Sequence, residues 1–374
     1  LKDYYKNLPI TSEEEEKIIS DASKEPKTNS LESYYNNLKT EQEPTQEAKE
    51  STTNTNLNAI DIGADILVSG TQGAAKGVTY LADIPSLLGN GMEYLTDKAA
   101  AAVGIDAKQI RSENKNRRKE INKSIEVNCR IDQTKLVVIF INPEDPFPSA
   151  YFKKSLSKEA FNKIQLREIE PGGRTTYSDI FEYANQNLVG ENCILCNNDI
   201  SFDETLSLID FDISGHFLSL TRWDVLPDNS LSFKQPARIR KNSHDAWIFK
   251  PEIPKKMIDK GNFYMGRPGC DGMISYLATI SGLHVFNPSE VVKAKHLHLS
   301  RHRTYRRRHR MGGDDIFMYV YPTDKLEFQP EKLMYKFGKT KKMVFGQEAI
   351  DTAIQNEEEN QVHWDWALEK CRTR

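Results

Sequence analysis

One stretch constrains this chain more than any other: an apolar run of strand length that ends in two amides and a carboxylate. Residues 193–196 read Cys-Ile-Leu-Cys, and Asn197, Asn198 and Asp199 follow directly. Side chains alternate along a strand, so Asn197 and Asp199 share one face. Two oxygen-bearing side chains at such a position can meet one hard cation, and open α/β sheets keep their ligand crevice at the carboxyl ends of strands. A plain strand that runs into a turn gives the same pattern.

Apolar segments of strand length alternate with helical patterns from residue 117 to about residue 290. Besides the strand at 193–196, strands are expected at 136–141, 164–169, 217–221, 246–250 and 284–287. Helices are expected from Arg118 onward, at 176–188 behind the capping box Thr176-Tyr-Ser-Asp179, and at 269–282. This alternation predicts an α/β fold with a mostly parallel sheet flanked by helices.

The first 112 residues differ in character from this part of the chain. Residues 1–55 are rich in Glu, Gln, Lys, Thr and Asn, and we expect them to be disordered or loosely helical. The stretch Leu1-Lys-Asp-Tyr-Tyr-Lys-Asn-Leu8 recurs as Leu31-Glu-Ser-Tyr-Tyr-Asn-Asn-Leu38. Its Leu/Tyr spacing fits a short amphipathic helix that docks on a protein partner. Chance similarity in a biased sequence is the alternative.

Residues 56–112 are rich in Gly and Ala, and helices are expected at 64–81 and 95–103, packed as a hairpin on the main domain. The segment resembles the Gly/Ala-rich helical pieces of virion-associated proteins of tailed phages, which implies a virion-associated location as the alternative to the cytoplasm. The expected organisation is therefore an acidic segment (1–55), a helical segment (56–112), an α/β domain (113–310) and a C-terminal extension (311–374).

The chain carries five cysteines and a net charge of −3. Cys193 and Cys196 lie on a strand whose side chains alternate, so they do not converge on one zinc ion. Buried, reduced thiols in a cytosolic protein are the better interpretation. No apolar run approaches the length of about 18 residues that a membrane-spanning helix needs, so no membrane span is expected.

A set of motifs follows in order along residues 117–305: Gly173-Arg-Thr-Thr-Tyr-Ser-Asp179, Ala184-Asn185, Asn197-Asn-Asp-Ile-Ser-Phe-Asp203, Thr221-Arg-Trp-Asp224, His244-Asp-Ala-Trp-Ile-Phe249, Gly269-Cys-Asp271, Asn287-Pro-Ser289 and His296-Leu-His-Leu-Ser300. Together they resemble nucleotide-sugar-dependent glycosyltransferases of the GT-A fold. The resemblance implies a metal-dependent transfer of a sugar from a nucleotide-sugar donor to a glycan or another hydroxyl acceptor.

The resemblance also implies a metal site. GT-A enzymes hold Mn²⁺ or Mg²⁺ with an Asp-x-Asp motif, because the diphosphate that leaves the sugar needs a divalent ion. Asn197-Asn-Asp199 occupies that place, so Asp199 is the expected metal ligand, and the Asn in first position leaves one fewer negative charge. A late histidine completes the metal site in this family. His298 is favoured over His296, since imidazole is an acceptable ligand for manganese.

Donor and acceptor contacts follow from the same comparison. Arg174 can bind a phosphate bidentately, with a solvated loop arginine as the alternative. The side chains expected near the nucleotide or the donor sugar are Asp179, Asn185, Asn197 and Asn198. Aromatic faces and polar groups that can grip a sugar come from Arg222, Trp223, Asp224 and Trp247. For the two tryptophans, an ordinary place in the core is an equal alternative.

Asp271 begins the helix expected at 269–282, and the resemblance implies that it is the general base of an inverting reaction, which deprotonates the acceptor hydroxyl. The dipole at a helix N-terminus keeps a carboxylate ionised, which suits a base. The same position suits a plain helix cap. Asp245 is the rival candidate for the base.

The chain departs from the family in one respect. A GT-A domain begins with a strand ahead of the helix expected near Arg118, and residues 109–116 are too polar to form it. Either the 56–112 segment replaces this strand or a different edge closes the sheet. This departure, together with Asn197, motivates the alternative of a catalytically inactive sugar-binding protein that acts in the virion or in host interaction.

The C-terminal part begins with a basic run, Arg301-His-Arg-Thr-Tyr-Arg-Arg-Arg-His-Arg310. A solvated loop and a loop that covers the donor diphosphate are both considered. A nucleic-acid patch is disfavoured, because Tyr305 is its one aromatic residue. Beyond it we expect a strand at 317–321, a hairpin or short helix at 332–344 and an acidic helix at 347–368.

Overall fold

The computed structural model describes residues 65–70, 78–84, 107–143, 147–170, 173–226, 228–233, 243–297 and 310–372. The described residues from 65 to 225 and from 231 to 372 belong to one compact unit. All elements named below lie in this unit. The segments expected at 1–55 and 95–103, the basic run at 301–309 and His298 lie outside the described residues.

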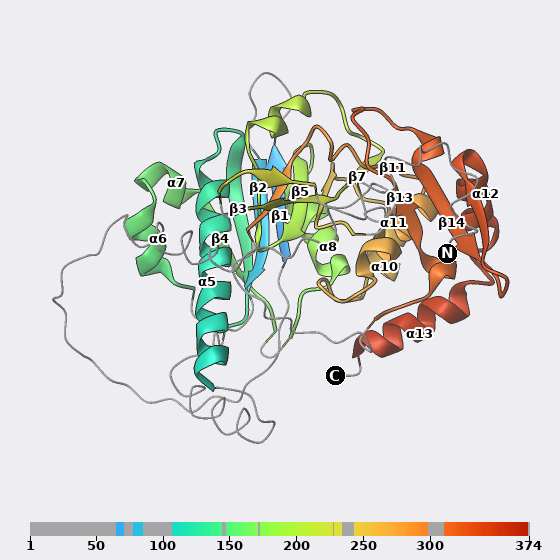
Figure 1. Ribbon diagram of the computed structural model, residues 1–374, viewed down its shortest axis with the longest axis horizontal. Helices are drawn as coiled ribbons and strands as arrows, with labels where there is room; N and C mark the ends of the chain where they lie inside the picture. The colour runs from blue at the N-terminus through green and yellow to red at the C-terminus, as the bar shows by residue number, and fades with distance from the viewer. Residues whose placement is uncertain are drawn as a thin grey trace, which may run out of the picture. The chain divides into compact units, whose positions relative to one another are not determined.

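A mixed sheet forms the centre of this unit (Figure 1). Its strands are β1 (Asp65–Gly70), β2 (Val78–Ile84), β3 (Thr134–Ile141), β4 (Ile164–Glu168), β5 (Asn192–Asn197), β7 (His216–Leu220), β10 (Ala246–Phe249) and β11 (His284–Phe286). The pairs β3–β4, β2–β3, β2–β5 and β7–β11 are parallel, whereas β10 runs antiparallel to both β5 and β7. The α/β class is confirmed, and the sheet is only partly parallel.

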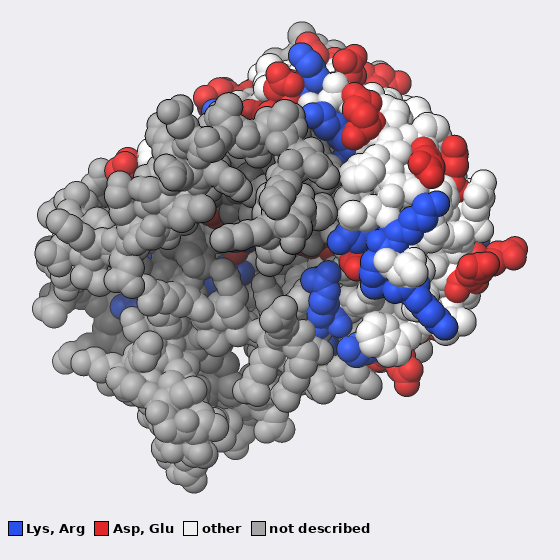
Figure 2. All heavy atoms as spheres, turned by 45° about the vertical axis from the view of Figure 1, so that its right-hand side comes forward, with Lys and Arg blue, Asp and Glu red and all other residues white. Residues whose placement is uncertain are grey.

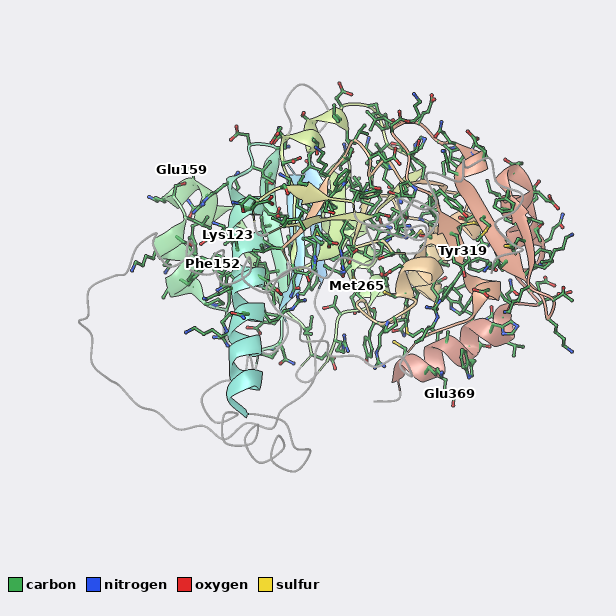
Figure 3. The ribbon with its side chains drawn as sticks, in the orientation of Figure 1. Lys123, Phe152, Glu159, Met265, Tyr319 and Glu369 are labelled. Carbon is green, nitrogen blue, oxygen red and sulfur yellow. The ribbon has the colours of Figure 1, made fainter. Side chains whose placement is uncertain are left out.

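Alternate residues of the central strands feed two separate cores. Val138 and Leu195 face one core, while Ile139 and Ile194 face the other. A strand that is buried on both faces reads as a continuous apolar run, which is why residues 136–141 and 193–196 were recognisable as strands. Figure 3 shows Phe152 on one side of the sheet and Met265 and Tyr319 on the other.

Helices cover both faces of the sheet (Figure 1). The bounds are α5 (Ala107–Arg130), α6 (Ser149–Ser155), α7 (Lys158–Asn162), α8 (Tyr177–Asn187), α10 (Lys255–Lys260), α11 (Cys270–Ile280), α12 (Gly346–Gln355) and α13 (Gln361–Arg372). α5, α6 and α7 pack on one face, and α8, α10 and α11 pack on the other. The capping box at the start of α8 is confirmed, with Thr176 and Asp179 bonded reciprocally.

Two expectations for residues 64–116 are wrong. Residues 65–70 and 78–84 are strands and not parts of a helix, and both lie along the gap between β3 and β5. The strand thought to be missing ahead of Arg117 is thus supplied from the Gly/Ala-rich segment. Residues 107–116 extend α5, which begins at Ala107 rather than near Arg118. The β-branched residues of 65–84 outweighed its Gly/Ala content, because the gap in the sheet gave them a place to pair.

Beyond their carboxyl ends, three strands of the main sheet lead into strands of a smaller sheet. This second sheet consists of β6 (Ile200–Ser201), β8 (Arg222–Val225), β9 (Leu231–Ser232) and β12 (Ala294–Leu297), in the order β6-β12-β8-β9. β5 leads into β6, β7 leads into β8, and β11 leads into β12. The carboxyl ends of β5, β7 and β11 therefore meet where one sheet passes into the other.

The C-terminal part adds a third sheet and two helices. β13 (Met318–Val320), β14 (Leu333–Phe337) and β15 (Lys342–Phe345) form the sheet, so the strand at 317–321 and the hairpin at 332–344 are confirmed. The single acidic helix expected at 347–368 is instead α12 and α13. The break lies at Asn360, whose buried amide donates to the hydroxyl oxygens of Tyr276 and Tyr335 at 3.0 and 2.8 Å.

Lysine is frequent on the β14–β15 hairpin, where Lys339, Lys341 and Lys342 are exposed. Figure 2 shows Lys and Arg side chains gathered in one area of the face it displays, with Asp and Glu side chains around that area. β15 is an edge strand of its sheet, and lysines on an edge strand oppose pairing with a second chain.

All five cysteines lie within the described residues and are buried, which confirms the burial expected for the thiols. Across the described part of the chain, no helix has both the length and the apolar surface that crossing a bilayer requires.

Leu195 sits at the centre of β5, fully buried, and β5 positions the residues that follow it. Replacing Leu195 with Ala should lower the free energy of unfolding by about 2–5 kcal/mol, because the strand is packed on both faces. Leu208→Ala, at a position that is 40% exposed, is the matched control and should cost less than about 0.5 kcal/mol. Urea unfolding measures both, and equal losses would contradict the assignment of Leu195 to the core.

Candidate functional site

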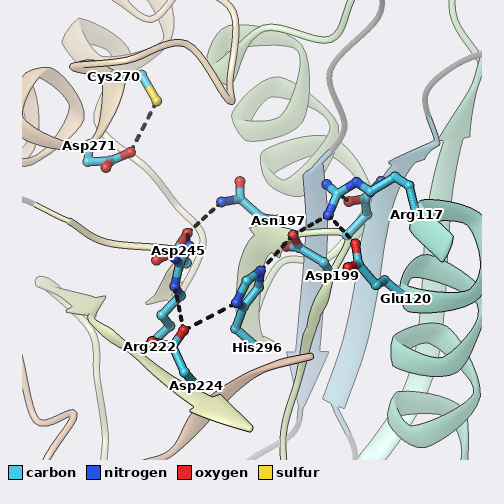
Figure 4. A network of polar contacts seen from close by, with 11 residues as sticks. Arg117, Glu120, Asn197, Asp199, Arg222, Asp224, Asp245, Cys270, Asp271 and His296 are labelled. Atoms are coloured by element: carbon cyan, nitrogen blue, oxygen red, sulfur yellow. Dashed lines mark hydrogen bonds and ion pairs between the residues drawn. The ribbon is translucent and has the colours of Figure 1, made fainter. Parts of the chain in front are cut away.

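The candidate site lies where the two sheets meet, and the strand register of the small sheet builds it. β12 pairs with β6 on one side and with β8 on the other, which puts His296 opposite Ile200 and opposite Asp224. Asp199 immediately precedes β6. The imidazole of His296 is therefore held between two carboxylates that come from different parts of the chain (Figure 4).

Both ring nitrogens of His296 contact a carboxylate. Nε2 lies 3.1 Å from Asp199 Oδ2, and Nδ1 lies 3.3 Å from Asp224 Oδ1. The His296 side chain is 1% exposed, so neither contact is diluted by solvent. An imidazole fixed at both nitrogens has a defined ring orientation, as is usual for a histidine that binds a metal or relays a proton.

Arg222 joins this group to a third carboxylate, that of Asp245 (Figure 4). Its Nε donates to Asp224 Oδ1 at 3.2 Å, and its Nη1 donates to Asp245 Oδ1 at 3.3 Å. Asp245 Oδ1 also accepts from Asn197 Nδ2 at 2.9 Å. Asp245 Oδ2 is buried, and it has no hydrogen-bond partner among the described residues.

Arg117 of α5 closes the other end of the network. Its Nη1 lies 2.5 Å from Asp199 Oδ2 and 2.9 Å from Glu120 Oε2, and its Nη2 donates to Asn198 Oδ1 at 3.2 Å. Asp199 Oδ2 thus contacts two cationic groups, the guanidinium of Arg117 and the imidazole of His296.

These contacts set the charges at the site. Burial of Asp199 alone would raise its pKa, but Arg117 and His296 outweigh burial and hold that pKa well below its ordinary value of 3.8. Burial would likewise lower the pKa of His296, yet Asp199 raises it above 6.5. The charge of Asp245 raises the pKa of Arg222, although burial acts in the opposite direction. Acidic and basic side chains thus alternate along the site.

Asp271 differs from the other carboxylates. It lies in the first turn of α11, after Gly269, which has a φ of 97° and where an added Cβ would lie 2.6 Å from the Met311 carbonyl oxygen. Its Oδ1 accepts from Cys270 Sγ at 3.2 Å. Burial, with the charge of Asp245 adding to it, raises the pKa of Asp271 from 3.8 to about 7. Such a carboxyl group changes its protonation state near neutral pH.

Several other motif residues hold the junction of the sheets together. Asn287, after β11, is fully buried, and its Nδ2 donates to Thr221 Oγ1 at 3.0 Å and to the Val320 carbonyl oxygen at 3.3 Å. His244 Nδ1 lies 3.5 Å from Ser275 Oγ. Burial lowers the pKa of His244 to about 4, so this imidazole is neutral.

Three residues expected near the donor are occupied elsewhere. The carboxylate of Asp179 completes the capping box of α8 and accepts from the Thr176 backbone nitrogen at 2.7 Å. Asn185 pairs with the backbone of Ile253, which follows the antiparallel strand β10 and so lies toward the opposite edge of the sheet. The Arg174 guanidinium lies over the Tyr264 ring at 5.3 Å from its centroid. The structure does not bring these side chains into the network.

The two tryptophans lie in different environments. Trp247 is fully buried and packs edge-on against Tyr177 at 5.5 Å, so it belongs to the core and cannot stack on a sugar. Trp223 is partly exposed on β8, donates to the Ser289 carbonyl oxygen at 2.6 Å and lies under the amine of Lys293. Trp223 is the partly exposed one of the two, and the centroid of the Phe233 ring lies 4.6 Å from that of its own ring.

Sequence reasoning missed Arg117 and Glu120, and it favoured His298 where the structure describes His296. A signal for Arg117 was present. It stands four residues before Ile121 on the buried stripe Ile121, Ile125 and Cys129 of α5, and a charged residue on a buried stripe needs a partner. No comparable local signal distinguishes His296, because its contacts depend on pairing with β6 and β8.

Two residues of the site lie at a distance from each other that suits neighbouring ligands of one divalent metal ion. Ligands adjacent in octahedral geometry at about 2.1 Å from a metal lie about 3 Å apart, and Asp199 Oδ2 and His296 Nε2 are 3.1 Å apart. Asp224 on Nδ1 is the outer carboxylate that typically orients a metal-binding histidine. Within the described residues no group of three or more His, Cys, Asp or Glu is arranged to hold a metal.

No protein-family model matches the chain, and the searches of curated proteins and of solved structures give no match.

Replacing Asp271 with Asn should change how stability depends on pH. Between about pH 4 and pH 7 the folded wild type holds a proton on Asp271 that the unfolded chain has released, so this group loses stability as the pH rises. Asn does not titrate. Relative to wild type, the variant should therefore gain up to about 1.4 kcal/mol per pH unit across this window.

Urea unfolding at a series of pH values from 4.5 to 8 measures this difference. Asp210→Asn, at an exposed position, is the control and should track the wild type. If the difference in free energy of unfolding between wild type and Asp271→Asn does not change with pH, the protonation of Asp271 is contradicted.

Proposed function

We propose that this chain is a metal-dependent glycosyltransferase of GT-A-like architecture, which moves a sugar from a nucleotide-sugar donor to a hydroxyl acceptor with inversion. The observation that carries the proposal is the line Asp224–His296–Asp199, with contacts of 3.3 and 3.1 Å, at the carboxyl end of β5. The partly exposed ring of Trp223 on the same strand as Asp224 suits a sugar face.

The order of the strands supports a ligand site at this edge. The parallel strands build outward from β2, through β3 and β4 on one side and through β5, β7 and β11 on the other, with the antiparallel β10 between β5 and β7. Ligands of open α/β sheets bind outside the carboxyl ends of parallel strands where the order reverses in this way. Asn197 ends β5 at this position, and Asn198 and Asp199 follow it.

Asp199 and His296 are the residues that would hold Mn²⁺ or Mg²⁺, and Asp224 would orient the imidazole. When bound, the metal supplies positive charge for the diphosphate that leaves the sugar. Arg222 lies beside Asp224 and Asp245 and adds a fixed positive charge on the same side. Asn197 is held by Asp245, which favours an orienting role for this amide over direct ligation.

Asp271 is the proposed general base. In the transfer, the acceptor oxygen forms a bond to the anomeric carbon, the bond from that carbon to the phosphate oxygen breaks, and the acceptor proton passes to Asp271. A base works best when its pKa lies near the working pH, and burial with Asp245 nearby raises the pKa of Asp271 to about 7. The charge of Asp245 raises the pKa of Asp271, the proposed base. Asp245 Oδ2, which has no hydrogen-bond partner among the described residues, is positioned to accept a hydrogen bond from another hydroxyl of the substrate.

A sugar-binding protein without transfer activity, acting in a virion or in host interaction, is the second candidate. The contact of Asp199 with Arg117 favours it, because this carboxylate already has a cationic partner in the protein. Calorimetry separates the candidates: glycan binding without metal-dependent nucleotide binding supports the second, and metal-dependent nucleotide binding supports the first.

Incubation with mass-tagged nucleotide sugars and Mn²⁺ tests the transferase directly. Wild type should hydrolyse or transfer from at least one common donor, with kcat/KM rising as the pH passes through about 7, since the base must lose its proton. Asp271→Asn should lose about 10²–10⁴-fold in kcat while nucleotide binding persists.

Asp199→Asn should instead lose the metal dependence of nucleotide binding. Asp210→Asn is the matched control and should retain full activity. Failure of every common donor to bind or react in the presence of Mn²⁺ would contradict the proposed function.

A further inference from the structure

Asp199 Oδ2 contacts two basic groups of the site. Arg117 Nη1 lies 2.5 Å from it and His296 Nε2 lies 3.1 Å from it. These two contacts approach from different elements, α5 and β12. A metal ion bound to both Asp199 and His296 would have to share this oxygen with the guanidinium.

A carboxylate oxygen has two lone pairs, so it can face a guanidinium and a metal ion at once. Two cations at such short range in a buried site nevertheless repel each other, and each weakens the binding of the other. The guanidinium of Arg117 and a divalent ion therefore compete for Asp199.

Arg117 is built so that it can leave this position. Its side chain is 26% exposed, whereas the side chains of Asp199 and Glu120 are 8% and 1% exposed. The contact with Glu120 spans one turn of α5 and keeps the guanidinium near the site when its bond to Asp199 is broken. A freed guanidinium beside a metal site is well suited to bind a phosphate bidentately.

We propose that Arg117 is the resident counter-ion of Asp199, that a divalent cation displaces it, and that the displaced guanidinium turns to the diphosphate of the donor. Arg117 thereby sets the affinity of the site for metal. This inference rests on the proposed function, since it assumes that Asp199 and His296 bind the metal. It adds a residue that sequence reasoning did not assign to the site.

The test compares Mn²⁺ binding by wild type, Arg117→Gln and Arg118→Gln, with free Mn²⁺ measured by electron paramagnetic resonance and no nucleotide present. Arg118 is the exposed neighbour on the same helix and serves as the matched control. Arg117→Gln should bind Mn²⁺ on the order of 10-fold more tightly than wild type, because the competing cation is gone. Arg118→Gln should match wild type.

Thermal unfolding gives a second readout. Without metal, Arg117→Gln should unfold at a lower temperature than wild type, since Asp199 and Glu120 lose a shared partner. Saturating Mn²⁺ should then raise the unfolding temperature of Arg117→Gln more than that of wild type. Arg117→Lys keeps the charge but cannot retain both the Asp199 and the Asn198 contacts. It is the second variant and should bind Mn²⁺ more tightly than wild type and less tightly than Arg117→Gln.

The outcomes separate this inference from the proposed function. Equal or weaker Mn²⁺ binding by Arg117→Gln and Arg117→Lys, with wild type binding normally, overturns the displacement and leaves the metal site standing. Absence of Mn²⁺ binding in every chain overturns both.

Discussion

A carboxylate buried between two cations is the interaction on which this site depends. Asp199 is almost fully removed from water, and an isolated charge there would be strongly unfavourable. The guanidinium of Arg117 and the imidazole of His296 keep Asp199 ionised, and they bind α5, β5 and β12 to one another in doing so. Because removing one partner of a buried pair leaves the other uncompensated, these elements cannot shift independently.

A chain of polar contacts continues from His296 through the rest of the site. His296 is fixed by Asp224, Asp224 by Arg222, and Arg222 by Asp245. No ion pair to Asp271 is seen within the described residues, and burial together with the charge of Asp245 raises its pKa to about 7, whereas the pKa of Asp199 is held low. The two aspartates thus acquire opposite shifts in pKa from their neighbours.

The parts of the site that were predictable from sequence are those announced by local signals. Asp199 follows an apolar strand, and Asp271 follows a glycine at the start of a helix. His296 owes its place to strand register, which nearby residues do not reveal. Arg117 owes its place to helix packing, and its position on the buried stripe of α5 is a local signal that was overlooked. The strands at 65–70 and 78–84 were expected to be helical because the segment is rich in Gly and Ala. Val78, Thr79 and Ile84 form a strand instead, because β3 and β5 leave room between them for it, which is a tertiary feature.

The continuation of β5, β7 and β11 from the main sheet into the small one has a consequence for how this chain can vary. The imidazole reaches Asp199 because Phe286 at the end of β11 and Ala294 at the start of β12 are separated by a connection of fixed length, anchored by Asn287. A slip of one residue in the pairing of β12 with β6 and β8 would turn every side chain of β12 to the opposite face. The connection that seats β12 therefore decides whether an imidazole or its neighbour faces Asp199.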